Sequence, residues 1–330
     1  MLFLTSLLLA CTPDNEIQRR SHTDVFAQEP LSEVDILWVI DDSNSMAEEQ
    51  LRVADGFEAF IQNLAETNID FHVGVISTDM DIDNPNRGVL LGDPHYLTID
   101  TPNYVNKFAN RVQVGTEGSD KEKGISASVA ALSEPLVSGV NEGFLREDAH
   151  LSIIYVSDED DCSDNDALAG ESAEACYSQE GKLVAVKDLI YELKGTKDPD
   201  RRVLASAIVG PEAGQGCADS WPGHRYQGVS EQLGGQVHNI CEGDFSAIME
   251  ELGLAVSELN RSFQLSYTPV LETMEVVVEN ELIDQDDVDG WSYDDQASLL
   301  VFAGDYVPPR GAQIQVTYEV AGAAADPEDE

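Results

Sequence analysis

The sequence of 330 residues predicts an α/β protein with a doubly wound, mostly parallel sheet, followed by a small all-β module. Two observations predict the first part: short, continuously apolar segments, and amphipathic helical segments between them. Apolar strands of this kind are typically buried on both faces, and their alternation with helices favours a parallel sheet. A third observation predicts the module, because only short alternating strands separated by Pro, Gly and Asp turns follow residue 263.

Each predicted element follows from its hydrophobic period. Strands of the sheet are expected at 35–40, 71–77, 151–157, 203–209 and 237–240. Helices are expected at 46–64, 104–111, 123–132, 140–148, 183–193 and 245–261, with a long loop at 79–103. Strands of the module are expected at 263–267, 274–278, 298–302 and 313–320. The predicted domains are therefore 34–262 and 263–320, preceded by a flexible polar tether at 12–33 and followed by a disordered acidic tail at 321–330.

The charge balance is extreme, with 63 acidic against 18 basic residues and a formal net charge of −45. Such a surface repels nucleic acid, so we expect no nucleic-acid partner. The acidity fits a solvated surface suited to a saline habitat or a general cation-binding character. The even spread of acidic residues along the chain favours the first interpretation.

The N-terminus carries a short apolar run that ends in Leu8-Leu9-Ala10-Cys11. This pattern resembles a bacterial lipobox, with residues 1–11 as the signal peptide and Cys11 as the lipid-modified residue. The run is too short to span a bilayer as a helix. No Lys or Arg precedes it, so either the translation start lies upstream or the lipobox interpretation fails. The resemblance implies a lipid-anchored envelope protein, and Thr12 after the cysteine favours the outer membrane or surface.

The remaining cysteines form an even set without C-x-x-C spacing, which argues against metal or redox motifs: Cys162, Cys176, Cys217 and Cys241. Three pairings are open, and the sequential one closes the shortest loops. Disulfides persist outside the cytosol, so the set indicates the periplasm or cell surface.

One motif carries the candidate chemistry. The apolar strand 35–40 is followed at once by Asp41, Ser43 and Ser45 at alternate positions. These hard oxygen donors suit a small divalent cation such as Mg²⁺ and need neither thiol nor imidazole. The alternative is that the two serines merely cap the following helix.

This D-x-S-x-S pattern resembles the start of the metal-ion-dependent adhesion site of von Willebrand factor type A (VWA) domains. The strand 151–157 runs into Asp158, as in the family's T-D-G segment, although Glu159 replaces the glycine. A glycine-bearing loop at 114–120 offers Ser119 or Thr116 as the further hydroxyl ligand. Exported deltaproteobacterial VWA lipoproteins are the nearest resemblance. It implies Mg²⁺, or else Mn²⁺ or Ca²⁺, as cofactor.

The resemblance implies a non-catalytic binding protein that captures a carboxylate of a protein partner through the metal ion. Two alternatives stay open: an accessory subunit of an envelope enzyme or assembly complex, and a degenerate VWA domain that serves as a structural spacer. No H-E-x-x-H, G-x-S-x-G or glycine-rich phosphate motif supports an enzyme.

Overall fold

A computed structural model describes residues 20–28, 33–66, 69–198, 201–212, 217, 220–257, 262–286, 288–295, 298–302, 306–309 and 311–320. The predicted lipobox with Cys11 and the predicted tail at 321–330 lie outside these residues. The chain divides into two compact units. We call Leu31–Glu258 the parallel unit, and Met1–Pro30 with Leu259–Glu330 the antiparallel unit.

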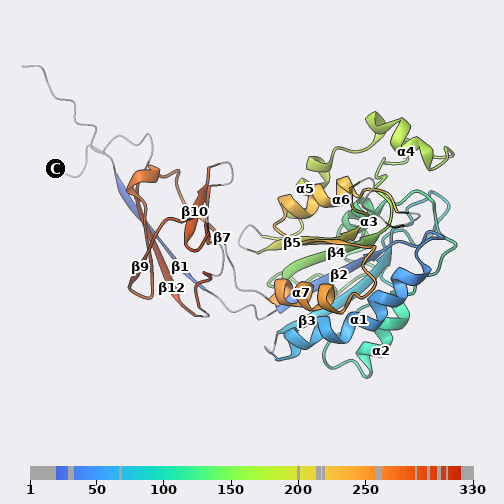
Figure 1. The fold of residues 1–330 in the computed structure, drawn as a ribbon, viewed down its shortest axis with the longest axis horizontal. Coiled ribbons are helices and arrows are strands. Elements are labelled where there is room, and N and C mark those ends of the chain that lie inside the picture. The colour runs from blue at the N-terminus through green and yellow to red at the C-terminus, as the bar shows by residue number, and fades with distance from the viewer. Residues whose placement is uncertain are drawn as a thin grey trace, which may run out of the picture. The chain divides into compact units, whose positions relative to one another are not determined.

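The parallel unit is built on a five-stranded parallel sheet of order β3-β2-β4-β5-β6. Figure 1 labels the first four of these strands. Its strands are β2 (Glu33–Ile40), β3 (Asp70–Ser77), β4 (His150–Ser157), β5 (Val203–Val209) and β6 (Val237–Asn239). Its helices are α1 (Ala47–Glu66), α2 (Tyr104–Arg111), α3 (Gly124–Ala131), α4 (Glu174–Ser178), α5 (Val186–Lys194), α6 (His224–Gln232) and α7 (Ser246–Ser257). Short 3-10 turns lie at Glu180–Lys182 and, in the other unit, at Leu271–Thr273.

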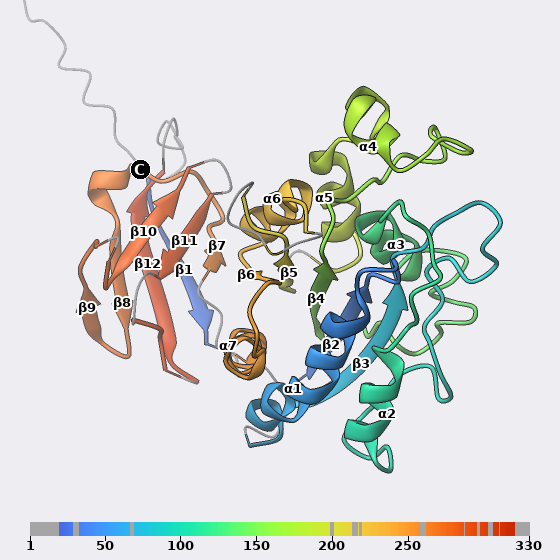
Figure 2. The same cartoon turned by 45° about the vertical axis from the view of Figure 1, so that its right-hand side comes forward.

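Both faces of this sheet are covered by helices, as Figure 2 also shows. Alternate residues of β2 supply the two cores, because successive side chains of a strand point to opposite faces. Trp38 packs with Phe57 of α1 and Phe108 of α2 on one face, where α7 also lies. Leu37 packs in the other core, which is covered by α3, α5 and α6 and includes Tyr226.

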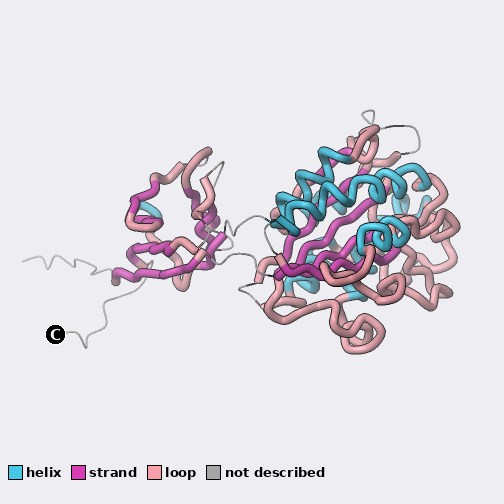
Figure 3. Tube along the Cα trace, turned by 90° about the horizontal axis from the view of Figure 1, so that it is seen from below, coloured by secondary structure: helices cyan, strands magenta, loops and turns pink. Residues whose placement is uncertain are grey.

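Long connections follow the carboxyl ends of the strands, and Figure 3 shows them gathered at one end of the sheet. In parallel sheets these ends share an edge, which is where ligands bind in open α/β folds. This arrangement places the candidate site.

The antiparallel unit contains two sheets, of order β1-β12-β8-β9 and β10-β11-β7. Its strands are β1 (Ser21–Ala27), β7 (Ser262–Gln264), β8 (Glu275–Val278), β9 (Glu281–Ile283), β10 (Trp291–Asp294), β11 (Leu299–Phe302) and β12 (Gln313–Glu319). Alternate apolar residues of β12 fill its core, namely Ile314, Val316 and Tyr318. A separate core of this kind makes the unit a packed body of its own.

The predicted fold class is wrong for the chain as a whole. Among the described residues, seven strands lie in antiparallel sheets and five in the parallel sheet, so the chain is not mostly parallel. The antiparallel part also does not simply follow the other. The segment 12–33, predicted as a flexible tether, contains β1, which pairs with β12 from Ser21–Glu319 to Ala27–Gln313.

Individual elements also differ from the prediction. The helix predicted at 140–148 is wrong, because this stretch forms successive turns and Gly143 has a positive φ of 84°. Helices α4 and α6 and strands β9 and β10 lie where no element was predicted. Each is short or weakly periodic, so the sequence pattern does not distinguish it from a loop.

Candidate functional site

Three neighbouring strands deliver polar side chains to the same edge of the parallel sheet. The first residues after β3, β2 and β4 are Thr78, Asp41 and Asp158. The backbone stays paired through this step: Asp41 N–H donates to Val156 O (3.0 Å), and Thr78 N–H donates to Ile40 O (3.1 Å). The carboxyl groups therefore emerge side by side where the sheet ends. We call this edge the acidic edge.

Asp41 is fully buried and is held by donors from its own loop and from β4. Its Oδ1 accepts the Ser43 N–H (2.7 Å), and its Oδ2 accepts the Ser157 hydroxyl (2.6 Å). Gln50 of α1 donates to the Asp41 backbone oxygen (2.9 Å). The hydroxyls of Ser43 and Ser45 are hydrogen-bonded to each other (3.2 Å). Burial raises the pKa of Asp41, and the bonds from Ser157 and Ser43 oppose that shift.

Asp158 is 5% exposed, and its Oδ1 is a buried oxygen that accepts no hydrogen bond from the described residues. Burial, followed by the charge of Asp41, raises the pKa of Asp158 to about 7, against the opposing effect of a hydrogen bond from Ser45. The structure thus brings together four of the predicted site residues, namely Asp41, Ser43, Ser45 and Asp158.

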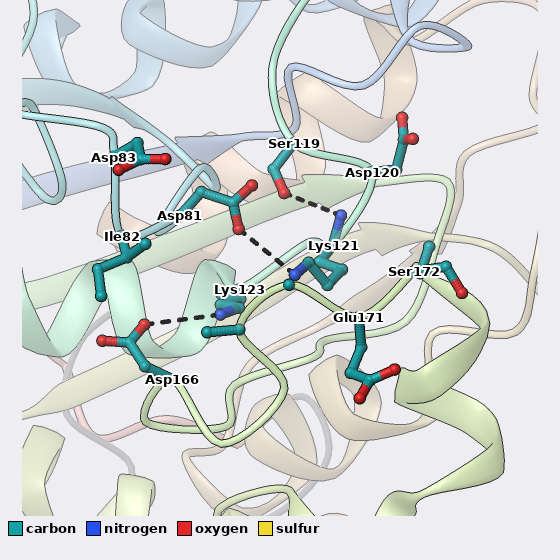
Figure 4. A pocket seen from close by; sticks show the side chains of 13 residues that line it. Asp81, Ile82, Asp83, Ser119, Asp120, Lys121, Lys123, Asp166, Glu171 and Ser172 are labelled. Carbon is teal, nitrogen blue, oxygen red and sulfur yellow. Dashed lines mark hydrogen bonds and ion pairs between the residues drawn. The ribbon is translucent and has the colours of Figure 1, made fainter.

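The two alternative hydroxyls lie in different pockets. Figure 4 shows Ser119 in a pocket of about 360 Å³, where its hydroxyl accepts the backbone N–H of Lys121 (3.1 Å). Asp81 and Lys121 form an ion pair across this pocket (3.7 Å). Thr116 lines a separate groove of about 590 Å³ together with Asp42. The loop that carries both residues is joined to the acidic edge at Gly118, whose N–H donates to the backbone oxygen of Asp42 (2.9 Å).

Sequence reasoning missed Glu122, which is the most deeply buried carboxyl group of the acidic edge after Asp41. Thr78 donates a short hydrogen bond to its Oε2, whereas its Oε1 is buried without a donor among the described residues. Burial, followed by the charge of Asp41, raises the pKa of Glu122 well above its ordinary value. Its flanking residues Lys121 and Lys123 make the segment read as a solvated surface, yet all three are buried.

Two further carboxyl groups of the acidic edge were not predicted as site residues. Burial, followed by the charge of Asp79, raises the pKa of Asp42 to about 6. Asp42 Oδ1 is buried without a donor from the described residues, and Gly118 packs so closely that an added Cβ would lie 2.2 Å from this carboxyl group. Burial, followed by the charges of Asp41 and Asp120, raises the pKa of Glu159 to about 7.

The chemical character of the acidic edge follows from these groups. It has a surplus of acceptor oxygens and raised carboxyl pKa values, which is the electrostatic signature of a site that lacks positive charge. A cation or a cationic side chain placed here would supply what the protein's own donors do not.

Two disulfides brace the loops beside the acidic edge. Cys162 is bonded to Cys176 and Cys217 to Cys241, with Cα–Cα distances of 5.4 Å in both cases. This is the sequential pairing. The first bridge follows Asp158 closely in the chain, and the second joins the segment between β5 and α6 to the residues just after β6.

Comparisons with known proteins correct the family assignment. No family model matches the chain, and no curated protein matches it. The chain is distantly similar to pilus adhesin SpaC of Lactobacillus rhamnosus GG, with 11% identity and a TM-score of 0.41 over 90% of this chain and 41% of that one. It is also similar to the adhesive tip pilin GBS104 of Group B Streptococcus agalactiae, with 11% identity and a TM-score of 0.38 over 96% of this chain and 85% of that one. The match to proximal thread matrix protein 1 of the mussel byssus has 14% identity and a TM-score of 0.42, and it covers 73% of this chain and 51% of that one.

The chain spans about two fifths of the length of the SpaC adhesin. These matches carry no VWA description, and with no family model matching, the predicted VWA membership is wrong.

The predicted metal-ion-dependent adhesion site is corrected as well. Within the part of the chain that the structure describes, no group of three or more His, Cys, Asp or Glu side chains is arranged to hold a metal ion. Both oxygens of the Asp41 carboxylate accept hydrogen bonds from protein donors, namely the Ser43 N–H and the Ser157 hydroxyl. Mg²⁺, Mn²⁺ or Ca²⁺ as a cofactor of this edge stays a prediction.

None of the described helices is both long and apolar enough to cross a membrane.

Proposed function

We propose that this chain is an exported, non-catalytic binding protein of the cell surface, and that the acidic edge is its binding site. One observation supports the proposal above others: three buried carboxyl oxygens there accept no hydrogen bond from the described residues, namely those of Asp42, Glu122 and Asp158. Leaving a buried acceptor without a donor costs about 1–3 kcal/mol, and more for a charged group. A ligand that brings positive charge would remove that cost.

Export is supported by the two disulfides, because such bonds persist in oxidising compartments. Acylation of Cys11 as a membrane anchor remains part of the proposal and is tested by mass spectrometry of the membrane fraction. A soluble protein with an unmodified N-terminus would contradict the anchor.

The ligand of the acidic edge is defined by its chemistry as a positively charged group. Two sources share that chemistry: a divalent ion, and a basic side chain of a protein partner. A partner carboxylate, as predicted from the sequence, would require the ion first. A basic side chain of the partner would contact the acidic edge directly and would not require a metal ion.

The test is calorimetric titration of the full chain with MgCl₂, with CaCl₂ and with an arginine-bearing peptide. We expect at least one of these to bind, and we expect its binding to weaken about 10- to 150-fold in Asp158→Asn, since removing one charged partner costs about 1.5–3 kcal/mol. Asp148→Asn is the matched control, because that carboxylate is 82% exposed and precedes β4, whereas Asp158 follows the other end of that strand. Equal binding by both variants would refute the proposed site.

A further inference from the structure

Two aromatic side chains lie exposed next to one another in the parallel unit. Tyr177 is 40% exposed and Trp221 is 56% exposed, and their ring centroids are 5.6 Å apart with an interplanar angle of 34°. The other two tryptophans, Trp38 and Trp291, are buried. Large aromatic rings bury much apolar area and have a polar handle, so an exposed pair marks a surface for recognition. We call Tyr177 and Trp221 the aromatic shelf.

Each ring of the aromatic shelf is held by a cross-linked loop. Tyr177 follows Cys176, which is bonded to Cys162. Trp221 lies between the two cysteines of the other bridge. Its backbone is further fixed by Gly210, where an added Cβ would lie 1.9 Å from the Trp221 carbonyl oxygen. A surface whose rings are already fixed loses little conformational entropy when a partner binds.

The aromatic shelf adjoins the acidic edge. The backbone N–H of Trp221 donates to the carbonyl oxygen of Asp158 (2.7 Å). Burial raises the pKa of Tyr177, and the nearby charges of Glu159 and Asp160 raise it further. Arg225 is already bound to Asp161 (3.0 Å), so Asp161 is compensated from within the chain. The backbone of Asp158 is thus bonded to Trp221 and the charge of Glu159 acts on Tyr177, so the shelf borders the acidic edge.

Aromatic faces and carboxylates together select one kind of side chain. A guanidinium stacks on aromatic rings through its planar π system and donates in a fork to carboxylates, whereas an ammonium does neither as well. The formal net charge of −45 draws basic partners to the molecule. We propose that the aromatic shelf docks an arginine-bearing segment of a partner protein, with the guanidinium between the two rings and the acidic edge. This inference rests on the proposed function, because the same edge supplies the negative charge.

The experiment measures binding of a synthetic peptide of alternating arginine and glycine, with its lysine counterpart as a probe of charge alone. The peptide is titrated into the full chain at an ionic strength of about 0.15 M. At this ionic strength the Debye length is about 8 Å, so attraction between distant charges is largely screened. We expect Trp221→Ala and Tyr177→Ala each to weaken binding of the arginine peptide about two- to fivefold. The double variant should weaken it on the order of tenfold. Tyr191→Ala is the control, since Tyr191 is 80% exposed and lies on α5. It should leave binding unchanged.

A second readout comes from Trp221 itself, the only exposed tryptophan of the chain. Saturation with the arginine peptide should protect its fluorescence from acrylamide quenching, and the lysine peptide should protect it less. Equal binding of the two peptides, or unchanged quenching at saturation, would overturn the inference.

Two carboxyl variants separate the inference from the proposed function. Binding that is lost in Asp158→Asn and Glu159→Gln but kept in the double aromatic variant would refute the aromatic shelf and leave the acidic edge standing. Loss in the aromatic variant alone would refute the acidic edge as the binding site, and with it the docking of a guanidinium between the rings and that edge. Binding that neither set changes would refute both.

Discussion

Asp158 and Glu159 show how burial sets the chemistry of single residues at the acidic edge. Their pKa values near 7 mean that the folded chain retains protons that the unfolded chain has already released. The unfolded state binds fewer protons in that range, so the free energy of unfolding must fall as pH rises.

The pH prediction follows from the sign of these shifts. In buffer without divalent ions, the stabilisation is complete below about pH 4, near the ordinary carboxyl pKa, and is lost as pH rises through about 7. The melting temperature of the parallel unit should therefore fall between these values, and less steeply in Asp158→Asn. Differential scanning calorimetry across that range checks it. A melting temperature that rises with pH would contradict the assignment.

Asp35 is a second residue-scale case, at the start of β2 and far along that strand from Asp41. It is fully buried and accepts hydrogen bonds from Arg146 (2.8 Å) and Lys197 (2.9 Å). Asp35→Asn leaves the Lys197 ammonium buried without its counter-charge, which should lower the free energy of unfolding by about 3–5 kcal/mol. Urea denaturation measures the loss. Asp148→Asn, at an exposed pair, should cost no more than about 1 kcal/mol, and similar losses in both would refute this role.

At the scale of elements, β1 illustrates what local patterns predict and what they miss. Strands β2 to β5 are predicted by their apolar runs, and α1 is predicted by Phe57, Phe60 and Leu64 at helical spacing. These elements could therefore be recognised from the sequence. The pattern of β1 is polar and mostly exposed, and its partner β12 lies at the other end of the chain. A strand that is stabilised by pairing with such a distant segment shows no local hydrophobic period that would predict it.

The same limit applied to the candidate site. Asp41, Ser43, Ser45 and Asp158 could be predicted because each follows directly from a strongly apolar strand. Glu122 could not, because its burial depends on how the loop before α3 folds over the acidic edge. Its neighbours in sequence are lysines, and only tertiary packing makes all three inaccessible.

Asp24 of β1 gives the prediction at this scale. It accepts hydrogen bonds from the Ser266 hydroxyl (2.6 Å), the Ser266 N–H (3.0 Å) and the Tyr318 hydroxyl (2.7 Å). Asp24→Ala removes the acceptor and leaves those donors unpaired, so we expect the antiparallel unit to lose about 2–3 kcal/mol. Thermal unfolding followed by near-ultraviolet circular dichroism reports it. Thr23→Val is the control, since it breaks only an exposed bond to Thr317, and an equal loss there would argue against the role of Asp24.

At the scale of the whole molecule, the chain has two units with separate hydrophobic cores. A body with its own core unfolds as its own cooperative unit. Calorimetry of the full chain should therefore resolve two transitions, and a fragment of Leu31–Glu258 should retain one of them. A single transition in the full chain together with an unfolded fragment would show that the units depend on each other.

The covalent path through β1 has a mechanical consequence. A load applied between the N-terminal side of the chain and a ligand held by the parallel unit enters at Arg20, runs along β1 and leaves at Gln28. Strands β7 to β12 are not in that path, because they all follow the parallel unit in the chain. Since β1 is already extended at about 3.3 Å per residue, tension along it gains almost no length. Of the antiparallel unit, only β1 therefore carries the load, and the other strands are not pulled apart. Strand β12, which pairs with β1 along its length, supports the strand under tension.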